Sequence, residues 1–449
     1  MHAGGPHILG MTPSPIPKRS VWSWILYDLA NTIFSMGVVS LYFSLWVRDE
    51  VGAERADAVY GIITAVSMGI IFVISPLLGA MTDRARRRMP FLIVSTLLCV
   101  GFTMLIARSG YWVTMLAFIF ANAAYQAGLQ FYDALLPEVT TEENRGRISG
   151  IGVGIGYLGS YFAVGIGFLP QSSDKPFLFT AIAIAFLVLS IPCFLFVKER
   201  GNPNPRPVFG LAMIRDSTRE TIKTLRGGSE YPGLIRFLVG RVFYTDAINT
   251  VISIMTLYTV NVAVATGLST KEGEGKARLI MLAAISFAVL GGFMWGAMVD
   301  RIGPKRTLNA VLWLWVATFI GASAVGLLAL PWETLFVVAS MAGVALGGVW
   351  SADRPYMLRL TPPSRIGEFY GLYGMVGRFS AITGPIVWAA VTWICIGQLG
   401  MKPAMGQGIG VLVLLSFIFI ARWILGPVRD EPRDWEALGS ASRYGAITS

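Results

Sequence analysis

Apolar and polar positions follow one another along this chain in long blocks, with apolar stretches separated by short polar segments. A helix needs roughly 20 mostly apolar residues to cross a bilayer. The pattern therefore predicts an all-α membrane protein that crosses the bilayer many times. We predict twelve transmembrane helices at 20–46, 58–81, 89–107, 111–134, 148–169, 176–197, 233–261, 278–299, 307–329, 332–353, 367–396 and 407–425.

One longer polar segment, at 198–232, divides the spans into two groups of six. Its Pro, Gly and Asn content predicts a linker, and an apolar stripe beside its arginines predicts an amphipathic helix on the lipid headgroups. The predicted organisation is a cytoplasmic leader (1–19), an N-terminal six-helix bundle (20–197), the cytoplasmic linker (198–232), a C-terminal six-helix bundle (233–425) and a cytoplasmic tail (426–449).

The two groups of spans carry the same polar pattern. A D-x-x-N-T-x-x-S motif in the first span returns 218 residues later in the seventh, and its spacing puts the polar side chains on one helix face. G-A-M-T-D-R after the second span likewise returns as G-A-M-V-D-R after the eighth. These repeats predict two pseudo-symmetric bundles, as in many secondary transporters. The motif residues are Asp28, Asn31, Thr32 and Ser35, then Asp246, Asn249, Thr250 and Ser253.

Composition and charge agree with the membrane class. Hydrophobic residues make up 54% of the chain and charged residues 14%, whereas soluble proteins carry about 25% charged residues. The formal net charge of +10 comes from Lys and Arg that gather on the loops of one side, which predicts cytoplasmic termini and not a nucleic-acid partner. The leader has no apolar segment before its first basic pair, so we expect no cleaved signal peptide.

Enzyme chemistry is not expected. The three cysteines lie in apolar stretches and both histidines lie in the leader, so the sequence shows no metal-ligand spacing and no histidine proton relay. A phosphate-binding loop of the Walker type is also absent from the sequence, which disfavours ATP-driven transport. We expect no bound metal and no cofactor beyond a coupling ion.

Charged residues deep inside a span are costly and usually mark a binding or coupling site. Asp28, Asp246 and Arg378 lie well inside their spans, and Arg241 is intermediate. A desolvated carboxylate can carry H⁺, a set of carboxylate, amide and hydroxyl oxygens suits Na⁺, and a static pair with an arginine only holds the bundle together. These three uses stay open. Arg378 with an aspartate would also suit a zwitterion such as an amino acid.

At this point the motifs resemble those of the major facilitator superfamily. The loop after the second span, with Gly79, Asp83 and Arg84, matches the superfamily's pattern and is repeated at 296–306. LYDLANTIFS, RVFYTDAINTVIS and GEFYGLYGMVGRFSAITGP resemble the vacuole-effluxer-like branch, which is named after fungal vacuolar amino-acid effluxers and has many bacterial relatives. The resemblance implies a monomer with a central cavity lined by spans one, four, seven and ten, and a bacterial cytoplasmic membrane location. Glycoside–cation symporters share part of the pattern.

The expected function is secondary active transport of a small polar solute, an amino acid or similar zwitterion, by alternating access with H⁺ or Na⁺ coupling. Efflux is one direction considered. A sugar–cation symporter is the alternative, and a non-transporting membrane receptor or scaffold is the alternative of another class. The expected partners are a small-molecule substrate and the lipid bilayer.

Depth within the spans divides the candidate residues into two sets. Asp133 and Asp353 lie over twenty residues past the external ends of their spans, so we assign them to a cytoplasmic gate. The predicted substrate or coupling-ion residues are Asp28, Asn31, Thr32, Tyr125, Gln126, Tyr157, Asp246, Asn249 and Arg378. The predicted gate residues are Gly79, Asp83, Arg84, Asp133, Arg147, Gly296, Asp300, Arg301 and Asp353.

Overall fold

The computed structural model describes residues 16–171, 174–208, 210, 213, 215–216, 219, 231 and 233–431, and all regular structure among them is helical. In this part of the chain, eleven helices are long and apolar enough to cross a membrane. The predicted third span coincides with an apolar helix of 17 residues, α4 (Met89–Leu105), which falls just short of that length. The chain is therefore an integral membrane protein with many membrane-crossing helices.

The helices before the linker follow the predicted order of spans. The first span is one continuous element in which a π-helical stretch joins two α-helices, so it runs from Lys18 to Val51. These elements are α1 (Lys18–Phe34), η1 (Ser35–Tyr42), α2 (Phe43–Val51), α3 (Ala53–Arg84), α4 (Met89–Leu105), α5 (Tyr111–Asp133), α6 (Leu136–Val139), α7 (Arg145–Ile166) and α8 (Lys175–Phe196).

The helices after the linker are longer on average than predicted. The elements are α10 (Leu234–Ala265), α11 (Thr270–Ile302), α12 (Pro304–Leu327), α13 (Thr334–Leu360), η2 (Pro363–Arg365), α14 (Ile366–Thr392), η3 (Trp393–Gln398) and α15 (Pro403–Leu425). The largest difference is in α11, which begins at Thr270 and not at the predicted residue 278. The difference that bears on the site is in α13, which ends at Leu360 and not at the predicted residue 353. The predicted amphipathic helix of the linker falls almost entirely outside the described residues.

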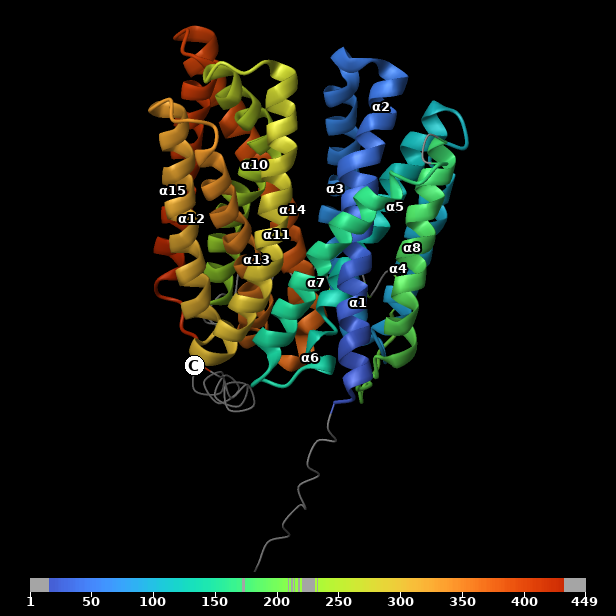
Figure 1. Cartoon of the computed structure of the whole chain (residues 1–449). Helices are drawn as coiled ribbons and strands as arrows, with labels where there is room; N and C mark the ends of the chain where they lie inside the picture. The colour runs from blue at the N-terminus through green and yellow to red at the C-terminus, as the bar shows by residue number, and fades with distance from the viewer. Residues whose placement is uncertain are drawn as a thin grey trace, which may run out of the picture.

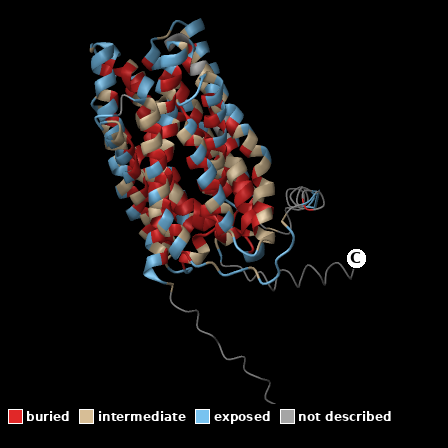
Figure 2. Ribbon diagram, turned by 90° about the vertical axis from the view of Figure 1, so that its right-hand side faces the viewer, coloured by how far each residue is buried: buried red, intermediate tan, exposed pale blue. Residues whose placement is uncertain are grey.

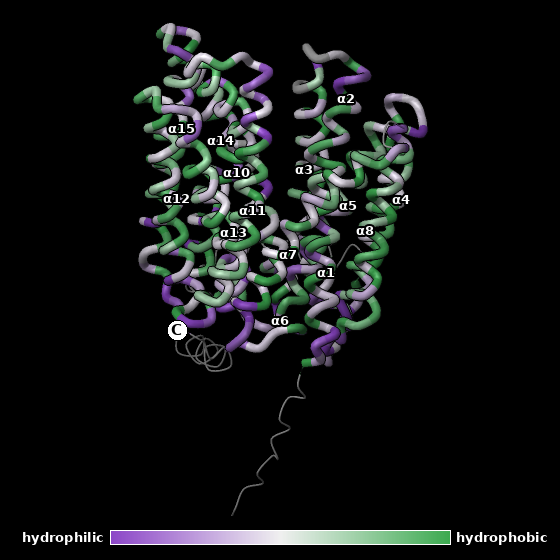
Figure 3. The backbone as a smooth tube through the Cα atoms, viewed as in Figure 1, coloured by the Kyte–Doolittle hydropathy of each residue, from purple (hydrophilic) through white to green (hydrophobic). Residues whose placement is uncertain are grey.

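The helices form two groups that stand side by side, α1 to α8 in one and α10 to α15 in the other (Figure 1). Buried residues lie mainly inside the groups and where they meet, while exposed residues cover the outside (Figure 2). Hydrophobic residues run along the helices, and hydrophilic ones collect at their ends and loops (Figure 3). This distribution is that of a protein whose sides face lipid and whose two ends face water.

The two groups touch at the end of the molecule where α3 and α11 end, which we call the closed end, and the ribbons stand apart at the other end (Figure 1). At the closed end Asp83 accepts hydrogen bonds from the N–H groups of Gly367 and Glu368, both at 2.7 Å, at the start of α14. Asp300 accepts from the N–H groups of Gly146 at 2.7 Å and Arg147 at 3.0 Å, at the start of α7. Each carboxylate thus caps a helix of the other half.

Glycines allow these helices to approach closely. A Cβ added at Gly150 of α7 would lie 2.3 Å from the carbonyl oxygen of Gly292 in α11, and one added at Gly79 of α3 would lie 2.2 Å from that of Gly367 in α14. These distances leave no room for a side chain, so backbone meets backbone. Close contact of backbone with backbone therefore joins the halves at α7 with α11 and at α3 with α14.

Candidate functional site

A cavity of about 400 Å³ lies between the two halves, a volume in the range that holds a small solute. Its walls come from α1, α3, α5 and α7 on one side and α10, α13 and α14 on the other. The lining residues are Asp28, Asn31, Thr32, Met68, Tyr125, Gln126, Leu129, Gln130, Asp133, Val153, Gly156, Tyr157, Arg241, Asn249, Trp350, Arg354, Tyr370, Tyr373, Gly374, Gly377 and Arg378.

Most of the predicted substrate or coupling-ion residues line this cavity. The structure brings together Asp28, Asn31, Thr32, Tyr125, Gln126, Tyr157, Asn249 and Arg378. Asp246 is the exception, because its carboxylate turns to α14 and does not line the cavity. The two copies of the repeated motif therefore do not contribute equally.

Asp28 lies in a buried ion cluster that joins the two halves. Arg354 of α13 places Nη1 3.3 Å from Asp28 Oδ2 and Nε 3.0 Å from Asp133 Oδ1. All three side chains are at most 10% exposed. One guanidinium thus serves two carboxylates, which leaves one excess negative charge on this side of the cavity.

Asp133 is therefore part of the cavity and not of the predicted cytoplasmic rim. The prediction measured depth from the external ends of the spans, but the chain beyond Asp133 does not leave the protein. It continues through the buried helix α6, whose Leu136 and Val139 are 0% exposed. The polypeptide around Asp133 is covered, and its carboxylate points to Arg354.

Arg354 was missed because the predicted tenth span ended one residue before it. Its helix instead continues to Leu360, although Pro355 follows directly. The signal in the sequence is the Asp-Arg pair at 353–354, which is flanked on both sides by apolar and aromatic residues and therefore belongs inside a span. An arginine so placed needs an acidic partner.

A second ion cluster forms around Asp353, which is 0% exposed and also does not lie at the rim. Its carboxylate accepts from Arg241 Nε at 2.8 Å, from the Tyr244 hydroxyl at 2.5 Å and from the Tyr373 hydroxyl at 2.9 Å. The Arg241 guanidinium also lies 3.6 Å from the centre of the Tyr373 ring. The cluster pairs one arginine with one carboxylate, so it carries no net charge. All its members belong to the second half.

Arg378 reaches from α14 across the cavity to the first half. Its Nη1 donates to Ser75 Oγ at 2.8 Å and its Nη2 donates to the carbonyl oxygen of Gln126 at 2.9 Å. The side chain is 6% exposed, and its Nε is buried with no hydrogen-bond partner among the described residues. No carboxylate in the described part of the chain forms an ion pair with it. Its positive charge is available to a ligand.

Asp246 has a different role. Its carboxylate accepts a hydrogen bond from the N–H of Gly384 at 2.7 Å and another from the hydroxyl of Thr383. Both residues lie in α14 directly before Pro385, which lacks an N–H and interrupts the helical hydrogen bonds. Asp246 thus ties α10 to the Pro385 region of α14 within the second half.

The predicted gate residues other than Asp133 and Asp353 lie at or near the closed end. Asp83 and Asp300 cap the facing helices, Gly79 and Gly296 pack against the facing backbone, and Arg147 donates its N–H to Asp300. Arg84 Nη2 lies 4.0 Å from Asp216 of the linker, while Arg301 is exposed.

The chain is similar to a bacterial and a fungal protein over most of its length. It is 25% identical over 390 residues to the uncharacterized MFS-type transporter YxiO of Bacillus subtilis, covering 81% of this chain and 86% of that protein. It is 27% identical over 334 residues to autophagy-related protein 22-1 of Penicillium rubens, covering 67% of this chain and 54% of the fungal protein. The chain spans about half of that fungal relative.

The fold agrees with these matches. The crystal structure of the human organic anion transporter MFSD10 (TETRAN) aligns with a TM-score of 0.67 and 16% identity, covering 92% of this chain and all of that one. This similarity shows the fold of the major facilitator superfamily. The model of the family described as "Vacuole effluxer Atg22 like" matches residues 50–394. The chain therefore belongs to the Atg22-like vacuole effluxer family of MFS-type transporters.

Proposed function

We propose that this transporter carries a small zwitterion, an amino acid or a similar solute, and that its transport is coupled to protons. The observation that carries the proposal is the separation of unbalanced charge across one cavity. The Asp28–Arg354–Asp133 cluster has one carboxylate more than it has positive groups. Arg378 carries a positive charge that no described carboxylate pairs with. A substrate ammonium beside the Asp28–Arg354–Asp133 cluster and a substrate carboxylate beside Arg378 would balance both charges.

The geometry of Arg378 supports a carboxylate ligand. Guanidinium groups bind carboxylates through two parallel hydrogen bonds. In the structure the Nη atoms of Arg378 donate to neutral oxygens of Ser75 and Gln126, which are weaker acceptors than a carboxylate. A substrate carboxylate would therefore displace these contacts.

Asn31 supplies a second reason to expect a polar solute. Its side chain is 3% exposed and lines the cavity, yet neither its Nδ2 nor its Oδ1 has a partner among the described residues. Buried amides are nearly always hydrogen-bonded, to protein, water or ligand. A solute that accepts from Nδ2 and donates to Oδ1 would satisfy this side chain.

Proton coupling fits the cluster around Arg354. Burial favours the neutral form of a carboxylate, and two carboxylates that share one arginine disfavour each other's charge. A proton on Asp28 or Asp133 would remove the excess charge and weaken the contact of α13 with the first half. Asp246 is a weaker candidate, because its carboxylate already accepts two hydrogen bonds within its own half.

Arg354 and Arg378 also connect binding to movement. Both belong to the second half, and both donate across the central cavity to residues of the first half. We place the closed end in the cytoplasm, since the basic loops gather there. A solute on Arg378 and a proton on the Arg354 cluster would loosen the inter-half contacts on which that closure depends.

The test is solute uptake in proteoliposomes, with a screen of amino acids, sugars and nucleosides under an imposed pH or Na⁺ gradient. We expect saturable amino-acid transport that follows the pH gradient and is lost in Arg378→Ala. Arg236→Gln is the matched control, because Arg236 is exposed at the start of α10 and outside the cavity.

Other outcomes separate the alternatives. Transport driven only by a Na⁺ gradient would show that Na⁺, and not H⁺, is the coupling ion. Transport unaffected by either gradient would overturn the proposal of coupling. Saturable sugar transport without amino-acid transport would favour a sugar symporter, for which the cavity rings of Trp350, Tyr125 and Tyr157 offer stacking surfaces. Correctly folded protein that moves no solute and tolerates Arg378→Ala would favour a receptor or scaffold.

A further inference from the structure

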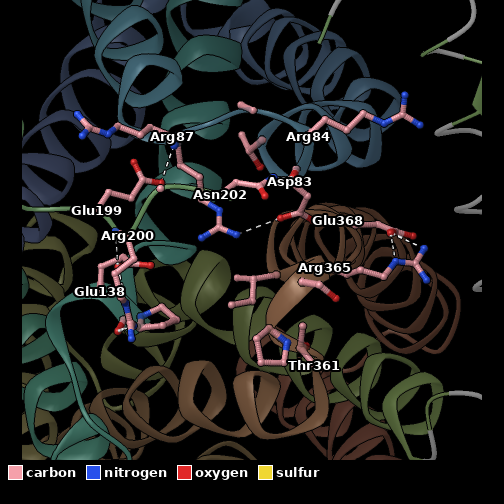
Figure 4. Close-up of a pocket in the computed structure, with 18 of the residues that line it drawn as sticks. Asp83, Arg84, Arg87, Glu138, Glu199, Arg200, Asn202, Thr361, Arg365 and Glu368 are labelled. Carbon is pink, nitrogen blue, oxygen red and sulfur yellow. Dashed lines mark hydrogen bonds and ion pairs between the residues drawn. The ribbon is translucent and has the colours of Figure 1, made fainter. Parts of the chain in front are cut away.

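A second cavity, of about 1090 Å³, lies at the closed end and is separate in place from the central one. Figure 4 shows residues of three regions around it: Asp83, Arg84 and Arg87 from α3 and the loop after it, Glu199, Arg200 and Asn202 from the linker, and Thr361, Arg365 and Glu368 from the second half. The cavity is therefore bordered by both halves and by the segment that joins them.

Arginine dominates the lining of this cavity. Among the described residues nine arginines line it, against five acidic residues, and no lysine does. The acids already accept hydrogen bonds or ion pairs: Glu138 from Arg200, Glu368 from Arg365, Glu199 from the N–H groups of Arg88 and Met89, Asp83 from α14, and Glu142 from Arg145 at 3.8 Å. Figure 4 shows the first two of these pairs. The arginines are Arg84, Arg86, Arg87, Arg88, Arg145, Arg200, Arg206, Arg359 and Arg365.

Two of these arginines have buried donors with nothing to bind. Nε of Arg88 and Nε of Arg145 are both buried without a hydrogen-bond partner in the described part of the chain. Arg145 of the first half is also repelled by the positive charge of Arg359 of the second half. Arg359 Nη1 donates to Asp430 at 2.9 Å and Arg88 Nη2 donates to Asp83 at 3.1 Å, so their remaining N–H groups are the ones that face a ligand. Unpaired buried donors and like charges across a boundary are both unfavourable. An anion between them would relieve both.

Membrane topology alone does not explain this arrangement. The positive-inside rule acts equally on the corresponding segment of the second half, which carries Arg301 at the end of α11 and Lys305 and Arg306 at the start of α12. None of those three residues lines the cavity. Seven of the nine described arginines belong to the first half and the linker, so the cavity breaks the symmetry of the repeat.

The linker builds one wall of the cavity by specific contacts. Asn202 donates its side-chain N–H to the carbonyl oxygen of Asp83 at 2.8 Å and its backbone N–H to that of Arg86 at 2.9 Å. The backbone N–H of Arg206 donates to the carbonyl oxygen of Arg84 at 2.8 Å. These bonds hold the linker against the arginine loop, so the basic wall is part of the fold.

We propose that this cavity binds a phosphate-bearing anion, with Arg88 and Arg145 of the first half and Arg359 of the second half as its main donors. Arginine suits phosphate because its planar group offers several N–H donors at once. The anion would bridge the two halves and stabilise the closed end. Its source is either a soluble phosphate compound or the headgroup of an anionic lipid, which share this chemistry.

The test is thermal unfolding of the delipidated full-length protein in detergent. Sodium pyrophosphate is compared with sodium chloride at equal ionic strength, and short-chain phosphatidylglycerol with phosphatidylcholine. A bound anion raises the unfolding midpoint of the wild type, by about 3 °C at saturating concentration. Arg145→Gln is expected to lose this rise. Arg306→Gln is the matched control, because it removes the same charge from an exposed position at the start of α12, outside the cavity.

The outcomes decide both the site and the source. A rise with pyrophosphate indicates a soluble phosphate ligand, and a rise with phosphatidylglycerol alone indicates a headgroup. If Arg145→Gln does not fold, Arg206→Gln replaces it, because the Arg206 side chain is exposed at the rim and should reduce the rise about twofold. Equal responses of the cavity variant and Arg306→Gln, or no response of the wild type to either anion, would overturn the proposal. The unfolding midpoint does not depend on transport, so this test is independent of the proposed substrate.

Discussion

Asp28 and Asp246 occupy the same place in a repeated motif, yet the two halves use them differently. Asp28 lines the central cavity and shares Arg354 of the opposite half with Asp133. Asp246 is 1% exposed, and its described partners, Thr383 and Gly384, belong to its own half. One carboxylate therefore joins the halves at a candidate binding site, whereas the other stabilises a single half.

The difference comes from the neighbours of each copy and not from the motif. The first copy faces an arginine of the opposite half, while the second faces a helix interrupted by a proline. A carboxylate is a strong acceptor for either partner, so the same four polar residues fit both environments. The repeated motif thus gives both helices the same polar face, and the residues packed against each face determine its role.

The largest expected effect follows from removing the partner that distinguishes Asp28. Arg354→Gln leaves two buried carboxylates without their counter-charge, which should lower the stability by about 3–5 kcal/mol. Thermal unfolding in detergent measures this loss, and the double variant with Asp133→Asn should recover part of it. If Arg354→Gln is as stable as the wild type, burial of the two carboxylates without Arg354 carries no cost in stability.

The next effect concerns transport. Asp28→Asn keeps the shape of the side chain but removes the excess negative charge beside Arg354. We expect a drop of roughly 100-fold in pH-driven uptake, equivalent to about 2.7 kcal/mol, together with a folded protein in the membrane. Exchange of solute between equal concentrations should fall less than net uptake, because exchange needs no proton. Unchanged net uptake would remove Asp28 from the coupling site.

Asp246→Asn is the matched substitution in the other half and should act on stability. It weakens the contacts with Gly384 and Thr383, at a cost of about 1–2 kcal/mol. The KM for solute and the dependence on the pH gradient should stay near wild-type values. A loss of coupling as large as that in Asp28→Asn would show that the halves are equivalent after all.

The smallest effect compares the two caps of the closed end. Asp83 accepts from two backbone N–H groups and also from Arg88 Nη2 at 3.1 Å, whereas the described hydrogen bonds to Asp300 come from two backbone N–H groups. Asp83→Asn should therefore open the closed end more than Asp300→Asn, by about 1 kcal/mol. Labelling of a cysteine introduced at Ser149, which is 0% exposed in α7, would report the opening in each variant. Equal labelling rates would indicate equal caps.

Much of the architecture follows from local features of the chain. Apolar length located the crossing helices, and the repeated G-A-M-x-D-R segments pointed to paired gate residues in the two halves. Both features are local, because a helix crosses a membrane or presents a face according to its own residues. For the same reason most of the candidate cavity residues were identified by their position in a span.

Pairing across the cavity could not be predicted in this way. The sequence by itself determined the class of protein, the two halves and the polar helix faces, since these follow from hydrophobicity and spacing. Only the tertiary structure decided that Arg354 joins Asp28 to Asp133, that Asp246 supports α14 and that the arginines of one loop line a second cavity. The physical reason is that a buried charge takes its partner from whichever helix lies opposite, and that helix is distant in the chain.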